Sequence, residues 1–317
     1  MVDGVLVPNK ERPAEADLAR RERMTMTSIT SQFTEGQKKQ YGRFVQDAGD
    51  RAFAETGFDK DSLQRLIENG DGFQADIIAS IARLSVTNQY ANEETESNYG
   101  YLSGYRNPVS IPDQIARLRE LFTGIELGTA DLLLAEQPKN PNADGPFAIP
   151  DWHLIASTYP EAVLKVFDLI KKTRGKFYNY GDGQIDSAHL RENKRSEKAW
   201  ATIRETQSGN TILIVQAQFG LRHRGRSVRR ALEVMSSSEF GLGAYATGIM
   251  LLTNPIRLQH YGDLWIDCAG DEWSWSADGV FGYAPFFSFR DGEVRFDTYE
   301  VECVSRFYGS VSAFLSQ

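Results

Sequence analysis

The stretch that most constrains the fold runs from Thr211 to Glu272, where apolar runs too continuous for half-exposed strands alternate with short helical segments. Strands that alternate with helices in this way pair in parallel, through right-handed crossovers. We therefore expect an α/β fold with a short, largely parallel sheet built by residues 211–269. The pattern predicts a strand over 211–217, a helix over 228–235, a strand near 246–252, a helical turn opened by Pro255 and a strand over 263–269.

Beyond Val280 the chain changes to aromatic-rich segments that are typical of antiparallel strands. The dipeptide Asp291-Gly292 lies between two of them and is a strong signal for a two-residue β-turn. Such a turn puts the apolar members of the facing residues on one side of the hairpin. We expect an antiparallel C-terminal extension of the sheet, in which Arg290 pairs with Glu293, Phe289 with Val294 and Phe287 with Phe296.

The rest of the chain divides into three parts by composition. Residues 1–33 mix prolines, charges and hydroxyl residues without a period, which predicts a disordered leader that is dispensable for folding. Residues 34–98 hold three helical patterns, the first opened by a capping box at Thr34 and Gln37, and predict a small N-terminal helical unit. Its acidic end has the composition of a linker. Residues 99–317 form the α/β domain.

Charge and cysteine content exclude several classes of function. The chain has 35 Lys and Arg against 43 Asp and Glu, so its net charge of -8 does not favour nucleic acid or an anionic membrane over the whole surface. Cys268 and Cys303 lack the spacing of a zinc site or a disulfide scaffold. Neither a long apolar run nor a secretory signal is present, so we expect no membrane partner and a cytoplasmic location.

A local basic patch follows the first predicted strand. Residues 220–227 match the spacing of a phosphate-binding P-loop, with Arg226 in place of the lysine. The missing lysine and the bulky charged interior argue against a nucleotide triphosphatase. Arginines at a helix N-terminus still favour an anion, so we expect a phosphate-bearing ligand, nucleotide or nucleic acid, at this loop. The residues expected to bind it are Arg222, His223, Arg224, Gly225, Arg226, Ser227 and Arg230.

Carboxylates follow the last predicted strand of the same stretch. Asp267 ends an apolar run, and Asp271 and Glu272 lie just beyond it. At the C-terminal edge of a parallel sheet, such oxygens could hold Mg²⁺ next to a phosphate. We expect Asp267 and Asp271 as metal ligands, and all three as catalytic groups if the chain performs metal-assisted phosphoester chemistry. The simpler interpretation is a polar strand end with solvated acids.

The arginines also admit a second interpretation. They could pair with carboxylates of the chain and fix the domain without binding a ligand. The chain would then be a non-enzymatic interaction or assembly protein, with its helical unit and leader in contact with a protein partner. The orientation of the side chains separates the two hypotheses. Arginines in an open cleft favour the anion site, and arginines buried against carboxylates favour the assembly protein.

Overall fold

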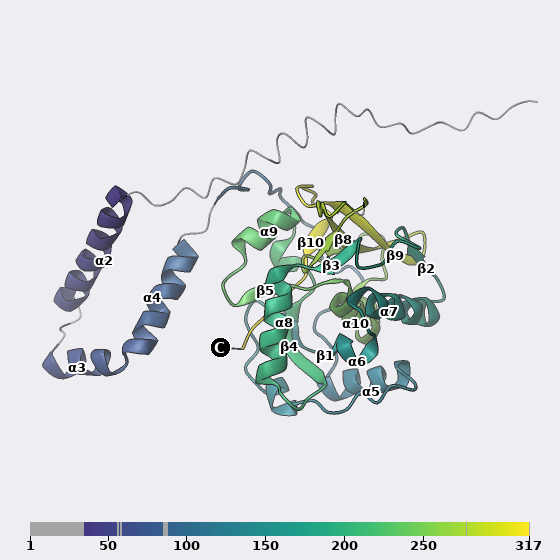
Figure 1. Cartoon of the computed structure of the whole chain (residues 1–317), viewed down its shortest axis with the longest axis horizontal. Coiled ribbons are helices and arrows are strands. Elements are labelled where there is room, and N and C mark those ends of the chain that lie inside the picture. Colours follow the sequence, from purple (N-terminus) through teal and green to yellow (C-terminus); the bar gives the residue numbers. More distant parts are fainter. Residues whose placement is uncertain (1–34, 56, 58, 85–87, 277, 317) are drawn as a thin grey trace, which may run out of the picture. The chain divides into compact units, whose positions relative to one another are not determined.

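The computed structural model describes residues 35–55, 57, 59–84, 88–276 and 278–316. The predicted leader and Thr34 of the predicted capping box lie outside these residues. The chain forms two compact units that divide between Ala75 and Asp76. The architecture is mixed α/β, with helices in the N-terminal part and two sheets in the second unit (Figure 1).

Three helices at the N-terminal end agree with the three predicted helical patterns. They are α2 (Glu35–Glu55), α3 (Lys60–Glu68) and α4 (Gly70–Leu84). The carboxylate of Asp59 accepts a hydrogen bond from the backbone N–H of Ser62 and so caps the start of α3. None of the side chains described in these three helices is buried.

One sheet of the second unit is antiparallel throughout and has the order β1-β4-β11-β5. The predicted strand at 211–217 is β4, in the interior of this sheet. The expected parallel series is wrong here, because the neighbours of β4 come from distant segments and run antiparallel to it. The four strands are β1 (Gly145–Pro150), β4 (Ile212–Gln218), β5 (Glu239–Gly241) and β11 (Ser312–Phe314).

The predicted strand near 246–252 is also wrong, because Ala244–Thr253 forms the helix α10. All ten residues of α10 are buried. A helix enclosed on every side is apolar all round, so its sequence lacks the period that separates a helix from a buried strand. The helix contacts β1, α5 (Ile111–Leu121) and α7 (Tyr159–Arg174).

The second sheet is mixed and holds seven strands in the described part of the chain. Its path is β10-β6-β8-β7-β3, with β9 paired to β8 and β2 paired to β9. Only the pairs β10–β6 and β2–β9 are parallel among them. The strands are β2 (Phe177–Asn179), β3 (Leu190–Glu192), β6 (Trp265–Asp267), β7 (Asp271–Trp273), β8 (Tyr283–Arg290), β9 (Glu293–Glu300) and β10 (Tyr308–Ser310). The expected largely parallel sheet is thus corrected to a mostly antiparallel one.

The β8–β9 hairpin confirms the predicted register. Arg290 lies opposite Glu293, Phe289 opposite Val294 and Phe287 opposite Phe296. Both turn residues have positive φ, 54° at Asp291 and 78° at Gly292, as this turn requires. The aromatic face packs in the core, where the rings of Phe287 and Phe296 contact that of Phe167 in α7.

The remaining helices cover the sheets or connect them. The helix α7 has residues typical of helix termini at both ends, with Pro160 in its first turn and Gly175 in the left-handed conformation after its last. The helix α8 (Lys194–Thr206) contacts β5 through the rings of Trp200 and Phe240. Within the described ranges, no helix is long and apolar enough to cross a membrane. The other helical segments are η1 (Leu132–Ala135), α6 (Trp152–Ile155), α8 (Lys194–Thr206), η2 (Leu221–His223), α9 (Val228–Val234) and η3 (Pro255–Arg257).

Candidate functional site

The basic loop has the predicted strand–loop–helix context, but its backbone is engaged by the protein itself. Gly220 has a φ of 115°, and a Cβ there would lie 2.5 Å from the carbonyl oxygen of Gly309. Gly225 has a φ of 76° and would collide with the carbonyl of Thr95. Each backbone N–H from Gly220 to Ser227 donates to an acceptor of the chain. A phosphate cradle needs free N–H groups, so this loop backbone offers none of the usual donors.

Arg229, at the start of α9, is held by Glu93 from the acidic segment before the domain. Its Nε lies 2.9 and 2.8 Å from the two carboxylate oxygens of Glu93. Its guanidinium carbon lies 4.5 Å from the ring centroid of Tyr90. The hydroxyl of Ser227 donates to the same carboxylate at 2.6 Å, and its oxygen accepts the N–H of Arg230 as the helix cap. The segment expected to be a linker is therefore fixed to the domain.

Arg230 and Arg226 bind the neighbouring acid, Glu94. Arg230 donates to Glu94 through Nε and to Glu233 through Nη1, the latter at 2.9 Å. Arg226 lies 3.4 Å from a carboxylate oxygen of Glu94. The carboxylate of Glu233 also accepts the backbone N–H groups of Gln89 and Tyr90. These bonds join α9 to residues 88–94.

A buried carboxylate, Glu239 of β5, binds the other side of the loop. It accepts hydrogen bonds from Arg222 Nε at 3.1 Å, from His223 Nε2 at 2.7 Å and from Ser312 Oγ at 2.7 Å. Burial opposes ionisation of Glu239, but the bonds from His223 and Ser312 and the charge of Arg222 outweigh it and lower its pKa. Burial also lowers the pKa of His223. Since Arg226 donates to His223 Nδ1, the proton of the neutral ring lies on Nε2.

Arg224 differs from the other arginines of the loop because it has no ion pair in the part of the chain that the structure describes. Its Nη1 donates to the carbonyl of Tyr99 at 3.1 Å. The rings of Tyr99 and Phe307 meet edge to face, with centroids 4.7 Å apart. The guanidinium carbon of Arg306 lies 5.4 Å from the ring centroid of Phe307. The ring of Trp265 also lies beside Phe307, with the two ring centroids 6.2 Å apart. We call Tyr99, Trp265 and Phe307 the aromatic strip.

Two of the three predicted catalytic carboxylates have structural partners. Asp271 is buried, where Oδ1 accepts a hydrogen bond from the hydroxyl of Tyr159 at 2.7 Å and Oδ2 accepts the N–H of Ala244 at 2.7 Å. It therefore caps α10. Glu272 lies nearer the surface and accepts from Arg191 Nε at 2.7 Å.

The third carboxylate, Asp267 of β6, is buried, and burial raises its pKa to about 8. The described residues contain no group of three or more His, Cys, Asp or Glu side chains arranged to hold a metal ion. The structure thus does not gather Asp267, Asp271 and Glu272 into one such group. Asp271 and Glu272 also come from β7, which is antiparallel to its neighbours, rather than from a loop at a parallel edge.

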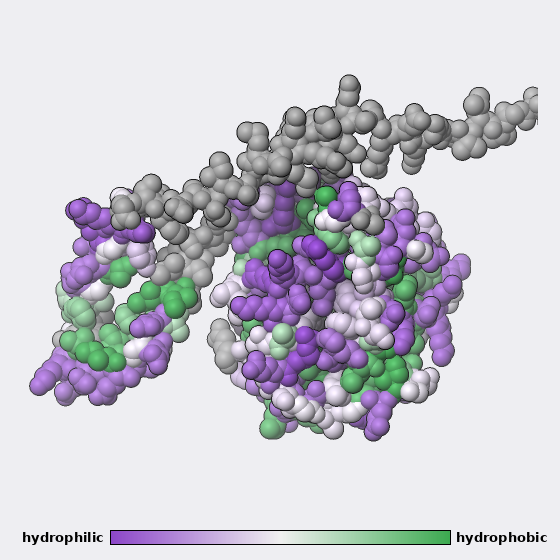
Figure 2. Space-filling model, in the orientation of Figure 1, coloured by the Kyte–Doolittle hydropathy of each residue, from purple (hydrophilic) through white to green (hydrophobic). Residues whose placement is uncertain are grey.

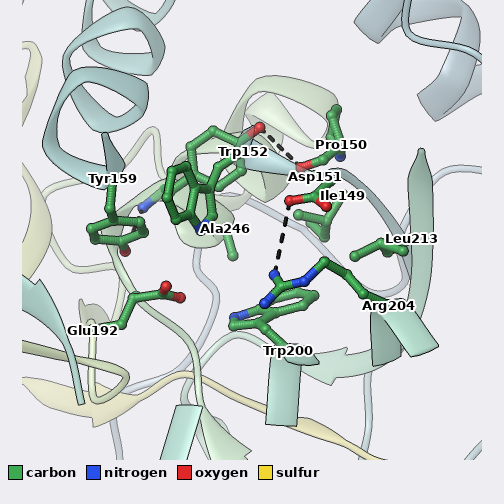
Figure 3. Close-up of a pocket in the computed structure, with 12 residues that line it drawn as sticks. Ile149, Pro150, Asp151, Trp152, Tyr159, Glu192, Trp200, Arg204, Leu213 and Ala246 are labelled. Carbon is green, nitrogen blue, oxygen red and sulfur yellow. Dashed lines mark hydrogen bonds and ion pairs between the residues drawn. The ribbon is translucent and has the colours of Figure 1, made fainter. Parts of the chain in front are cut away.

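A pocket that the sequence did not indicate lies where β1, α6, α7, β3, α8 and α10 meet (Figure 3). Its empty volume is about 290 Å³, part of it open to solvent. Figure 3 shows the carboxylate of Glu192 directed toward the space between the rings of Trp152 and Trp200, with Arg204 on the other side. Arg204 is 3.8 Å from Asp151.

Burial raises the pKa of Glu192 to about 7, so this carboxyl can gain or lose a proton near neutral pH. On β3 and β7, Glu192 lies opposite Asp271. The available sequence signals were indirect: Asp151 caps α6, and Asn193, which caps α8, directly follows Glu192. Both acids therefore lie at helix starts, which does not by itself indicate a pocket.

Comparison of the chain with protein-family models, with curated proteins and with solved structures finds no match.

Proposed function

We propose that this chain is a non-enzymatic interaction or assembly protein, and that its N-terminal helices make the contacts. The observation that carries the proposal is the exposure of large apolar side chains on α2, α3 and α4, visible as hydrophobic areas on these helices (Figure 2). Phe44 is 64 % exposed, Ile67 63 % and Ile78 65 %. Contiguous exposed apolar surface marks interaction sites.

These side chains form ordered faces. In α2, Tyr41, Phe44, Val45, Ala48 and Ala52 recur at the spacing of one helical face. Most helical stability in proteins comes from packing of the apolar face of the helix. A partner that covers the face would therefore stabilise the helix as well as bind to it.

The arginine cluster supports the same proposal. Four of the five arginines between 222 and 230 are bound to carboxylates of this chain, which leaves Arg224 alone among them for a ligand. Arginines that are already paired with carboxylates of the chain are less available to a second anion. The two free cysteines fit a reducing compartment, and we place the protein in the cytoplasm.

Site-specific photo-crosslinking in cells tests the proposal. A photoreactive residue at Phe44, Ile67 or Ile78 should give cross-linked protein products. The matched controls carry it at Asp47 or Glu68, polar positions of the same helices, and should give few. Equal yields from the two sets would overturn the proposal, since the apolar faces would then have no preferred contact.

The second candidate function is binding of a phosphate-bearing ligand, nucleotide or nucleic acid. It is favoured by Arg224 and Arg306, which have no ion pair among the described residues and lie beside the aromatic strip. Unpaired bases stack on such rings while arginines bind the phosphates. Titration of a labelled single-stranded oligonucleotide should show binding that weakens with salt and is lost in the variant R224A/R306A. No binding at low salt, or binding that this variant keeps, would remove the candidate; R117A on α5 is the control.

A further inference from the structure

The pocket around Glu192 has a polar mouth and a buried interior. Four half-buried residues line the mouth: Asp151, Trp152, Glu192 and Arg204. The other residues of the lining are buried. Only a small part of the space is enclosed, enough for a group about the size of one water molecule. A ligand that binds here therefore places one small group inside and the rest of itself at the mouth.

Several polar groups around the pocket already have partners within the chain. The hydroxyl groups of Tyr159 and Tyr245 donate to acceptors of the chain at 2.7 and 3.0 Å. Asp151 and Arg204 lie 3.8 Å apart and form an ion pair at the mouth. Their opposite charges largely cancel, so the pair does not favour a charged ligand of either sign.

The carboxyl group of Glu192 and the indole N–H of Trp152 differ from these groups. Glu192 has no ion pair in the part of the chain that the structure describes, and its carboxylate is directed into the pocket (Figure 3). The indole nitrogen of Trp152 is buried and has no hydrogen-bond acceptor among the described residues. Buried donors nearly always have an acceptor, and leaving one unpaired is costly. Both groups therefore favour a polar ligand.

These two groups lie close together. Burial raises the pKa of Glu192, and the nearby indole N–H of Trp152 partly offsets the rise. The indole N–H does not reach the carboxylate with the geometry of a hydrogen bond. A small group between them can therefore contact both.

The group that fits both is a hydroxyl. A carboxylate accepts hydrogen bonds and an indole N–H only donates, whereas a hydroxyl group does both. One hydroxyl can thus donate to Glu192 and accept from Trp152. An ammonium group only donates, so it would leave the N–H of Trp152 unpaired. It would also face the positive charge of Arg204 across the pocket (Figure 3).

We propose that this pocket binds a sugar, with one hydroxyl group of the sugar between Glu192 and Trp152. The half-buried indole ring at the mouth favours a sugar over a simple alcohol, because the C–H groups of a sugar ring pack against aromatic rings. Further hydroxyl groups of the sugar meet the charged side chains of Asp151 and Arg204, which bind them by charge-assisted hydrogen bonds. This site lies in the second unit and does not depend on the function proposed above.

Indole N–H signals in a proton–nitrogen NMR correlation spectrum of the full-length protein test the proposal. The chain has five tryptophans, and the variant W152F identifies the signal of Trp152 by its loss. The probes are glucose, galactose, mannose and xylose, each titrated separately. At least one of them should shift the Trp152 signal until the shift saturates. The absence of a saturable shift with all four would overturn the proposal, since the pocket would then hold water only.

Three variants examine the role of the carboxyl group. E192L keeps the approximate size of the side chain without its polar atoms, so it should bind the sugar at least about tenfold more weakly. E192Q keeps an oxygen that accepts a hydrogen bond, so its affinity should stay within about threefold of the parent. The matched control E205L changes an exposed glutamate of α8 and should keep the parent affinity. Thermal unfolding of each variant checks that it is folded. W152F, which keeps an aromatic ring without the N–H, replaces E192L if that variant does not fold, and should bind at least about threefold more weakly by the signal of Trp200.

The variants also separate a sugar from a cation. Equal losses of binding in E192Q and E192L would show that the site needs a negative charge, and would overturn the proposal. Methylammonium chloride is the probe for that case, and it should leave the Trp152 signal of the parent unchanged if the ligand is a sugar. Parent affinity in E192L would equally overturn the proposal, because Glu192 would then not contact the sugar. The photo-crosslinking experiment uses other residues, so its outcome leaves this test unaffected.

Discussion

Two buried carboxyl groups, those of Glu239 and Asp267, have pKa values that are shifted in opposite directions. Glu239 is met by three donors, from Arg222, His223 and Ser312, and stays ionised. In the described residues, no donor reaches the carboxylate of Asp267, and burial raises its pKa to about 8. Desolvation always opposes the charged form, and only hydrogen bonds or opposite charges offset it. The surroundings of each group therefore decide how stability depends on pH.

The lowered pKa of His223 predicts a loss of stability in mild acid. An unfolded histidine has a pKa of about 6.5, so below that pH the unfolded chain binds a proton that the folded chain does not. The contribution of His223 is full above pH 6.5 and falls as the pH decreases, by about 1.4 kcal/mol per pH unit. Denaturant titrations between pH 5 and 7.5 should show a smaller slope for H223Q than for the parent. Equal slopes would mean that His223 titrates normally.

The raised pKa of Asp267 predicts the opposite pH dependence. The folded chain keeps the proton up to about pH 8, whereas the unfolded carboxyl loses it near its usual 3.8. The parent should therefore lose stability relative to D267N by about 1.4 kcal/mol for each pH unit across this window. Denaturant titrations at pH 5, 6.5 and 8 measure the difference between the two proteins. A difference that does not change with pH would show that Asp267 is solvated in solution.

At the scale of elements, the sequence predicts structure where the signal is local. Asp291 and Gly292 define a turn by their own backbone preferences, so the register of β8 and β9 follows from a few neighbouring residues. The strand β11 lies between β4 and β5, and no local pattern in Ser312–Phe314 shows which strands it joins. The helix α10 is misread because its burial is complete. For segments such as β11 and α10, the position within the whole fold determines which secondary structure forms and which strands pair.

The close contact of α10 with α7 gives a prediction for Gly248. A Cβ on Gly248 would collide with Val166 Cγ1. Overpacking a core costs about 1–3 kcal/mol, and the better helix propensity of alanine offsets about 1 kcal/mol of that. G248A should therefore lower the free energy of unfolding by up to about 2 kcal/mol, measured by denaturant titration. V166A should cost less in the G248A background than in the parent, and additive effects would contradict the contact.

The ion pairs of α9 predict unequal effects for Arg224, in the basic loop, and Arg230, in the helix that follows it. Arg230 donates to Glu94 and Glu233, and its removal leaves both acids without that donor. Lost hydrogen bonds between charged groups cost about 1.5–3 kcal/mol, so R230A should destabilise the domain by that order. R224A, which breaks one exposed bond to a carbonyl, should stay within about 0.5 kcal/mol. Similar thermal shifts for the two variants would contradict the assignment of Arg230 as structural.

At the scale of the whole molecule, the candidate site depends on pairs that lie far apart in the chain. Glu93 and Arg229 are separated by 136 residues, and both were visible in the sequence as members of an acidic and a basic segment. Their spacing does not show that they meet. The pocket around Glu192 gathers residues from Ile149 to Ala246, each of them ordinary in its own segment. Composition gave the charges, and only the fold shows which of them are paired.

The two compact units should also differ in how they depend on protein concentration. If assembly of this chain covers the apolar face of α2, the amide protection of α2 against hydrogen exchange should rise with concentration, because association stabilises the folded helix by mass action. The strand β4 and the helix α10 are buried within the second unit, so their amide protection should not change with concentration. Exchange measured over a hundredfold dilution series of the full chain separates the two behaviours. Strong protection of α2 at every dilution would mean that its apolar face is covered within one chain. The variant F44S, which removes a large exposed side chain from this face, should remove the concentration dependence while leaving β4 unchanged.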